Sequence, residues 1–250
     1  MQKETSSETV FSDSTHRVKI GIFDSGMGGT TIFHAIKSTL KTADYLYLAD
    51  SKNCPYGEKS TAELQKIVEK NVQKLKEWGA EIIVIACNTA TVKCIDFLRQ
   101  KYPELKFVGT EPAIKLATNT TKKNILILAT PGTIASERTH ELLLKNQKPE
   151  QSITLLPCPG LADTIEHTLK FTQDYIPQPL EPTEKAIIHQ KLAELLKNIS
   201  APDMIVLGCT HYSLIKSEIQ HFFPKADIID GNAGVARQVK RLVDNLYKNK

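Results

Sequence analysis

Two stretches of the sequence, EIIVIACNTAT (81–91) and DMIVLGCTHYS (203–213), decide the fold. Each runs from a short apolar, β-branched stretch into a cysteine, and polar residues that can cap a helix follow the cysteine. An apolar run of this length predicts a buried strand, and the residues after it favour the start of a helix. The chain is therefore expected to contain the same strand-to-helix unit twice, with one cysteine at the carboxyl end of each strand.

The rest of the chain alternates in the same way. Short apolar stretches recur between longer amphipathic ones such as 61–78 and 184–197. Such alternation favours βαβ units, so the fold class is α/β with mainly parallel sheets. The expected strands are 18–23, 45–49, 81–86, 105–109, 124–129, 152–157, 203–208 and 226–230.

Further pairs of segments support an internal repeat. IGIFDSGMGGT (20–30) and ILILATPGTI (125–134) both run from an apolar strand into a turn that contains Gly and Thr. A third pair, FVGTEPA (107–113) and IIDGNAG (228–234), matches loosely. Repeats in the same order predict two similar α/β halves.

Length and composition exclude several classes of protein. The chain has 250 residues, 41% of them hydrophobic, and no apolar run approaches the roughly 20 residues of a membrane span. The first 17 residues are polar and lack the apolar core of a secretory signal. We expect a cytoplasmic protein with a disordered leader over residues 1–17 and no membrane partner.

The net charge of +4 comes from one segment. Residues 237–250 carry five basic groups and one acid. Apolar positions at helical spacing, among them Val235, Val239 and Val243, predict that this helix packs against the protein with its charges outward. Nucleic acid is therefore not an expected partner, and DNA binding stays a minor alternative.

The chain has five cysteines, which cannot all pair internally, and a cytosolic protein keeps its thiols reduced. No C-x-x-C pair occurs, so no metal site is expected; the nearest approach to ligand spacing is Cys209-x-His211. Cys54, Cys94 and Cys158 are expected to be structural, because a free cysteine is more often a small buried hydrophobic residue than a nucleophile.

Cys87 and Cys209 have a different setting. In open α/β sheets, ligands bind outside the carboxyl ends of the strands, where the next helix presents unpaired N–H groups. A helix N-terminus also lowers the pKa of a thiol from its free value of about 8.5. Two such cysteines, facing each other across a cleft, would be two thiol bases on opposite sides of one ligand.

Two polar turns supply further candidate contacts with a ligand. DSGMGG (24–29) is a Gly-rich turn between a strand and a helix, but it lacks the spacing of a nucleotide phosphate loop. Asp24 would repel a phosphate and fits better beside a thiol or an ammonium group. In CPYGEKS (54–60), Gly57 allows the backbone to approach a ligand closely.

The motifs DSGMGG, PYGEKS, ACNTAT, GTEPA, ATPGTIAS and GCTHYSLI occur in the order found in glutamate racemases. The chain resembles this family, within the aspartate/glutamate racemase superfamily, over about residues 18–243. The resemblance implies two domains, 18–112 plus 226–250 and 113–225, related by a pseudo-twofold axis with the active site in the cleft between them. It also implies an isomerase that needs no cofactor, takes glutamate as substrate and supplies D-glutamate for peptidoglycan. A homodimer is compatible with the family.

The resemblance also implies the roles of individual residues. Cys87 would take the α-proton from D-glutamate and Cys209 from L-glutamate, because inversion at Cα needs one base on each face. Asp24 would assist Cys87, while His211 and Glu166 would assist Cys209. Since a carboxylate beside a thiol opposes its ionisation, the thiolate is expected mainly in the substrate complex. The residues implied to contact substrate are Asp24, Ser25, Tyr56, Gly57, Asn88, Thr89, Thr210 and His211.

Several points stay open. Asp163 rivals Glu166 as the site carboxylate, and the proline-containing loop 171–183 lies either over the cleft or on the surface. The family usually has Asp-Ser-Gly where this chain has Asp-Gly-Asn at 230–232, and the segment after Cys209 is shorter than in many members. The alternative functions are a sister racemase for aspartate or another amino acid, a non-catalytic regulatory or binding protein, and a thiol redox or zinc protein.

Overall fold

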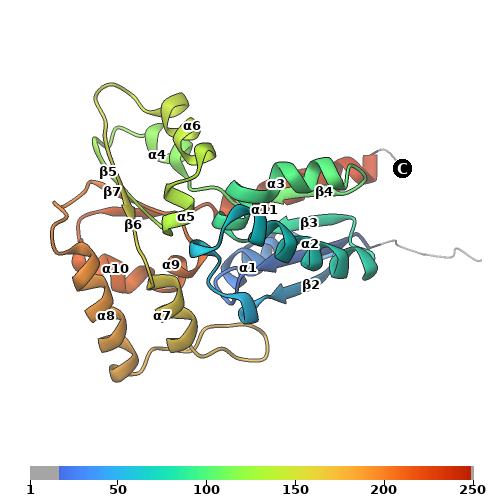
Figure 1. Cartoon of the computed structure of the whole chain (residues 1–250), viewed down its shortest axis with the longest axis horizontal. Helices are drawn as coiled ribbons and strands as arrows, with labels where there is room; N and C mark the ends of the chain where they lie inside the picture. Colours follow the sequence, from blue (N-terminus) through green and yellow to red (C-terminus); the bar gives the residue numbers. More distant parts are fainter. Residues whose placement is uncertain (1–16, 249–250) are drawn as a thin grey trace, which may run out of the picture.

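The computed structural model describes residues 17–248 and contains two four-stranded sheets (Figure 1). All strand pairs in them are parallel, and the strand order is β2-β1-β3-β4 in one sheet and β6-β5-β7-β8 in the other. The two orders are the same when each half is counted from its own first strand, so the predicted α/β class and internal repeat are confirmed. The strands are β1 (Lys19–Asp24), β2 (Asp44–Ala49), β3 (Ile82–Ile85), β4 (Lys106–Gly109), β5 (Asn124–Ala129), β6 (Ser152–Pro157), β7 (Met204–Leu207) and β8 (Asp227–Ile229).

Helices connect successive strands, because parallel strands need a crossover connection and a helix usually supplies it. Local sequence sets their starts: Ser60, for example, accepts a hydrogen bond from the backbone N–H of Glu63 at 3.2 Å and caps the second helix. Within residues 17–248, no helix has the length and apolar character needed to span a bilayer. The helices are α1 (Thr30–Thr39), α2 (Thr61–Glu77), α3 (Asn88–Lys101), α4 (Ile114–Thr118), α5 (Pro131–Ile134), α6 (Glu137–Asn146), α7 (Leu161–Thr168), α8 (Pro182–Leu196), α9 (Thr210–Leu214), α10 (Lys216–Phe222) and α11 (Asn232–Lys248), with 3-10 turns η1 (Ser51–Asn53) and η2 (Tyr56–Glu58).

The first sheet is covered by helices on both faces, which explains why its central strand β3 is apolar throughout. Successive side chains of a strand point to opposite faces. Ile20 and Ile22 therefore pack with α1 and α11, whereas Phe23 and Ile83 pack with α2 and α3. Every residue of β3 is buried.

The second sheet is built in the same way. Leu126 and Leu128 of β5 pack with α7, α8 and α10, while Ile125 and Ile127 pack with α4 and α6 on the other face. Every residue of β7 is buried, as in β3. The two central strands therefore hold the residues that follow them in fixed positions.

The C-terminal helix α11 returns to the first sheet. Its Val235, Val239 and Val243 are buried beside α1, and Lys240 on its exposed side pairs with Asp244 at 3.0 Å. The prediction that the basic segment forms the outer face of a packed helix is confirmed over the part of α11 that the structure describes.

The structure corrects one predicted domain boundary. Strand β8 pairs with β7, with Ile228 opposite Ile205, so residues 227–229 belong to the second sheet and not to the first domain. The physical reason is the repeat itself: β8 completes the second sheet as β4 completes the first. The chain crosses back only after β8, and α11 then joins the first domain. The predicted leader lies outside the described residues, except for Arg17.

The proline-containing loop joins α7 to α8 in the second half, and its side chains contact the first half. Tyr175, whose φ is +61°, places its ring 6.1 Å from that of Phe33 and 5.4 Å from that of Tyr47. The backbone oxygen of Tyr175 also lies 3.1 Å from Nε2 of His34. In Figure 1 the connection between α7 and α8 reaches towards β2. This loop is therefore a strap between the two halves.

Candidate active site

A small cavity lies where the carboxyl ends of β1, β3, β5 and β7 meet. It is lined from both halves of the molecule, and both predicted cysteines reach it. This is the edge at which parallel α/β sheets bind ligands. The lining residues are Ser25, Pro55, Tyr56, Gly57, Cys87, Asn88 and Thr89 from the first half, and Thr130, Ala162, Cys209, Thr210 and His211 from the second.

Cys87 follows β3 and occupies the N-cap position of α3. Its thiol lies 3.9 Å from Oγ of Ser25, to which it donates. The expected lowering of its pKa by the helix N-terminus is wrong for this residue. Burial raises the pKa of the Cys87 thiol well above its usual value, and the nearby carboxyl of Asp24 raises it further. In the ligand-free protein Cys87 is therefore a thiol.

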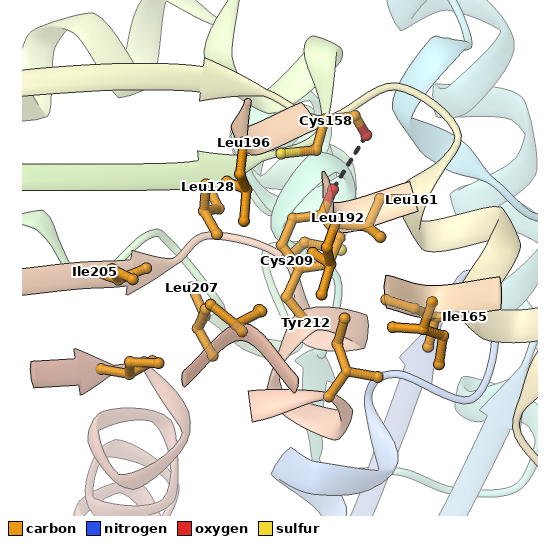
Figure 2. Close-up of a cluster of buried hydrophobic side chains, with 14 of the residues drawn as sticks. Leu128, Cys158, Leu161, Ile165, Leu192, Leu196, Ile205, Leu207, Cys209 and Tyr212 are labelled. Atoms are coloured by element: carbon orange, nitrogen blue, oxygen red, sulfur yellow. Dashed lines mark hydrogen bonds between the residues drawn. The ribbon is translucent and has the colours of Figure 1, made fainter. Parts of the chain in front are cut away.

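Cys209 follows β7 and occupies the N-cap position of α9, the equivalent place in the second half. Its Sγ lies 3.9 Å from Nδ1 of His211. Figure 2 shows Cys209 in a buried cluster with Leu207, Leu161 and Tyr212. One side of this thiol is therefore apolar, while the His211 ring supplies the polar side.

Two of the other cysteines, Cys94 and Cys158, do not line this cavity. Cys94 is buried between α3 and the first sheet, as expected. Cys158 belongs to the same buried cluster as Cys209, and its backbone oxygen accepts a hydrogen bond from the Tyr212 hydroxyl at 3.3 Å (Figure 2). Burial raises the pKa of each of these two thiols to about 12, which fits packing residues.

His211 forms a buried ion pair with Glu166. Its Nε2 lies 2.9 Å from Oε2 of the carboxylate, and the two side chains are 1% and 8% exposed. Burial alone would lower the pKa of His211, but its contacts with Cys209, Cys54 and Glu166 raise that pKa well above 6.5. His211 is therefore an imidazolium that lies between Cys209 and a carboxylate.

Glu166 is held by the first half of the molecule. It accepts hydrogen bonds from the backbone N–H of Met27 and from Oγ of Ser51, both at 2.8 Å. Burial raises its pKa, but His211 and these donors outweigh burial and bring it to about 2. Asp163, the rival carboxylate, has a 47% exposed side chain paired with His167. The structure therefore brings Glu166, not Asp163, to the site.

Asp24 lies behind Ser25 and does not line the cavity. Its Oδ2 accepts from the backbone N–H of Gly29 at 2.7 Å, and its Oδ1 lies 3.5 Å from Oγ of Ser25. Burial raises the pKa of Asp24, and the charge of His211 opposes this rise. Asp24 therefore lies beside Cys87 through Ser25, and the direct contact with substrate that the resemblance implied stays a prediction.

Two of the three glycines in the turn 24–29, Gly26 and Gly28, are explained by contacts with the second half. A Cβ on Gly26 would lie 2.5 Å from the Glu166 carboxylate, and one on Gly28 would lie 2.5 Å from Nδ1 of His211. The turn therefore packs closely on the His211–Glu166 pair, which explains why it lacks the spacing of a phosphate loop.

Threonines join the two halves on another side of the cavity. Oγ1 of Thr89 lies 2.8 Å from that of Thr130 and 3.1 Å from that of Thr133. A Cβ on Gly57 would lie 2.8 Å from Cβ of Thr130, so this glycine packs closely on the second half. Any opening of the cleft must break this contact. The predicted approach of Gly57 to a ligand stays a prediction.

Of the remaining predicted contact residues, Asn88 and Thr210 line the cavity as the first residues of α3 and α9. Tyr56 also lines it, but its hydroxyl donates to Oδ2 of Asp50 at 2.5 Å and accepts from Nδ2 of Asn71 at 3.0 Å. The hydroxyl of Tyr56 is therefore held by Asp50 and Asn71.

Comparison with known proteins agrees with this geometry. Residues 20–239 match the family model described as Asp/Glu/Hydantoin racemase. The chain belongs to this family. The chain is 37% identical over 239 residues to the glutamate racemase of Clostridium novyi (strain NT), and the match covers 94% of this chain and 85% of that protein. The chain is therefore an amino-acid racemase, which is a kind of isomerase. A glutamate racemase of Pseudomonas aeruginosa is 36% identical and covers 90% of this chain and 81% of its own length.

Solved structures of the family have the same fold. Escherichia coli glutamate racemase, in complex with L-glutamate and the activator UDP-MurNAc-Ala, superposes with a TM-score of 0.78 at 31% identity, over 92% of this chain and 83% of that one. An aspartate racemase from Picrophilus torridus superposes with a TM-score of 0.56 at 15% identity, which shows the shared fold alone. The family therefore accounts for the two-sheet architecture.

Sequence reasoning missed several residues at the site, among them Thr130, Ser51 and Cys54. Thr130 follows β5 just as Ser25 follows β1, and the repeat could have identified it. Ser51 and Cys54 lie in the turns after β2, and no periodic pattern connects them with α7 or α9. Their proximity to Glu166 and His211 depends on how the two halves pack together.

Proposed function

We propose that the protein interconverts L-glutamate and D-glutamate without a cofactor, by proton transfer between Cα and two thiols. The observation that carries this proposal is that Cys87 and Cys209 line one cavity from opposite halves of the molecule. Each occupies the N-cap position after the equivalent strand of its own sheet. Two bases are required because a single fixed group is poorly placed to remove a proton from one face of Cα and return one to the other.

In the direction from D-glutamate, Cys87 removes the α-proton and Cys209 donates one to the opposite face. In the direction from L-glutamate the roles are exchanged. Each thiol therefore acts once as general base and once as general acid, and a fixed position within hydrogen-bond reach supplies much of the rate.

The surroundings of the two thiols differ. The imidazolium of His211 lies 3.9 Å from Cys209 and places a positive charge beside that residue. Cys87 has Ser25 and the buried Asp24 instead, and burial holds its pKa well above the usual value. The ammonium group of the substrate offsets the Asp24 carboxylate, so the Cys87 thiolate forms mainly in the substrate complex.

The substrate carboxylates bind the polar edge of the cavity. The N-terminus of the 14-residue helix α3 presents backbone N–H groups and the side chains of Asn88 and Thr89. Thr210 and the backbone at Gly57 contribute from neighbouring sides. As charge develops on the substrate carboxylate next to Cα, these preorganised donors stabilise it.

The biological role that follows is supply of D-glutamate for peptidoglycan. Five cysteines without a disulfide, two of them needed as thiols, support action in the reducing cytoplasm. A homodimer stays a prediction.

A chirally resolved assay tests the proposal. The protein is incubated separately with each enantiomer of glutamate and of aspartate in deuterated water, and Cα deuteration and product chirality are measured. We expect both glutamate enantiomers to give a racemic, deuterated product. Inversion of aspartate but not glutamate would overturn the choice of substrate, and no exchange at all would overturn the catalytic function.

A further inference from the structure

We propose that Cys54, His211 and Glu166 form a binding site for a thiophilic divalent cation such as Zn²⁺, and that the bound cation blocks catalysis. The binding claim goes beyond the proposed function, while the inhibition claim rests on it. None of the proton-transfer steps uses Cys54, and its thiol does not line the cavity between the two cysteines.

The geometry brings together one ligand atom from each of three distant segments. The Sγ of Cys54, a ring nitrogen of His211 and a carboxylate oxygen of Glu166 all lie within 4.8 Å of one another. In a tetrahedral zinc site, bonds of about 2.0–2.3 Å place such atoms roughly 3.5 Å apart. The ligand atoms therefore need to approach one another by at most about 1.3 Å to complete the set.

The supporting contacts fix two of the three ligands. Glu166 is held by Met27 and Ser51, both at 2.8 Å, and the turn 24–29 packs on His211. Metal sites depend on such outer contacts to orient their ligands. Cys54 is partly exposed and Ser51 is exposed, so this side of the site provides a path for a cation from solvent.

The ligand chemistry selects the cation. Thiolate and imidazole favour zinc and related metals over Mg²⁺ and Ca²⁺, which prefer oxygen ligands alone. The Cys54 thiolate and the Glu166 carboxylate carry two negative charges, which balance a divalent cation in this partly buried place. On binding, the Cys54 thiol and the His211 imidazolium each release a proton to solvent, and no electron is transferred. Three protein ligands leave a fourth position for water.

Occupancy removes His211 from its part in catalysis. A neutral, metal-bound His211 no longer supplies the imidazolium beside Cys209. The cation also replaces the 2.9 Å contact between His211 and Glu166. Racemisation is therefore inhibited reversibly, and a chelator restores it.

Cobalt tests the binding claim without any activity assay. Co²⁺ is titrated into the full-length chain, and we expect one ion per chain with a thiolate-to-cobalt charge-transfer absorption band. Cys54→Ser removes the band and weakens binding by about 100-fold or more, since even loss of an outer contact costs about 10–100-fold. The matched control Cys94→Ser, which changes a thiol outside the set, leaves both unchanged. A band that persists in C54S, or one that is lost in C209S but kept in C54S, would overturn the site.

A second measurement needs no variant. The wild-type chain is alkylated with iodoacetamide in the presence and absence of Zn²⁺, and modified cysteines are located by peptide mass mapping. Zinc is expected to protect Cys54 selectively. Equal alkylation of Cys54 with and without saturating zinc would contradict the proposal whatever the fate of the variants.

Inhibition is measured separately. We expect Zn²⁺ to stop glutamate racemisation by the wild type and EDTA to restore it. The activity that C54S retains should respond to zinc at least tenfold more weakly than that of the wild type. Zinc binding at Cys54 without inhibition would overturn only the inhibition claim. Absence of racemisation even in EDTA would overturn the proposed function and leave the cobalt result to decide the site.

Discussion

The two halves of the molecule place a cysteine at the same backbone position but surround it differently. Cys87 and Cys209 each follow a buried central strand and precede a helix. Cys87 has a neutral hydroxyl, Ser25, as its neighbour, with Asp24 behind it. The repeat thus fixes where the thiols lie, while residues outside the repeated motif set the charge that each one meets.

The second half provides a cation at the corresponding place. His211 lies beside Cys209, and Glu166 lies behind His211. In both halves a carboxylate acts through an intermediate side chain, but only in one half is that side chain charged. We infer that substituting these neighbouring side chains changes the rate of proton transfer at one cysteine more than at the other.

The largest expected effect comes from removing either thiol. Cys87→Ser and Cys209→Ser should each lower kcat for racemisation by about 10⁴-fold, the upper range for loss of one general acid–base group, because both faces of Cα need one. The control is Cys94→Ser, which should keep its activity. Racemisation at the wild-type rate by either single variant would refute the two-thiol assignment.

The next effect distinguishes the two halves. Because the equilibrium constant of racemisation is one, kcat/KM is the same for both enantiomers in every variant and cannot separate the two thiols. An irreversible reaction can separate them, namely elimination from a glutamate analogue with a β-leaving group. His211→Asn should slow elimination from the L enantiomer by about 10²-fold and change the D reaction little.

The matched substitution in the first half is Asp24→Asn, which should act on the D enantiomer instead. Asp24 lies on the Cys87 side, behind Ser25. Equal losses for both enantiomers in both variants would show that the supporting side chains do not act on separate thiols.

A smaller effect concerns stability and pH. The pKa of Glu166 is about 2 in the folded protein, against 4.5 in the absence of its partners. Its contribution to stability is therefore present above pH 4.5 and is lost as the pH falls towards 2. Glu166→Gln should reduce the fall in unfolding free energy over this range by about 1–2 kcal/mol, with allowance for solvent screening. Denaturant unfolding at several pH values measures it, and an unchanged slope would contradict the assigned pKa.

The smallest effect concerns the strap. Tyr175→Ala removes ring contacts with Phe33 and Tyr47, which should cost about 1 kcal/mol of stability. Because Tyr47 donates to the Gly26 oxygen at 2.7 Å, we expect a few-fold lower kcat as well. Ile176→Ala, at a 51% exposed neighbour, is the control in thermal unfolding and in the assay. A change in Ile176→Ala as large as in Tyr175→Ala would count against a specific strap.

Much of the fold was predictable because periodicity reports burial. The apolar stretch 124–129 coincides with β5, and 152–157 coincides with β6. The domain boundary at 226 was wrong because the short strand β8 has only three residues, and its pairing with β7 is a long-range choice. No local pattern encodes such a choice.

The site was predictable where motif and repeat coincide, as at Cys87 and Cys209. The direction in which the pKa of Cys87 shifts could not be predicted. The sequence shows that Cys87 precedes a helix, but it does not show that the thiol is completely buried beside Asp24. Likewise Glu166 and Asp163 differ only in which face of α7 meets the first half. Packing between the halves decides these points.

The most direct test of the central claim uses the two single-thiol variants with both enantiomers of the β-leaving-group analogue. Each remaining thiol can still remove a proton from its own face of Cα. The account predicts that C87S eliminates from the L enantiomer only and C209S from the D enantiomer only. Elimination from both enantiomers by either variant, or the reverse assignment, would contradict it.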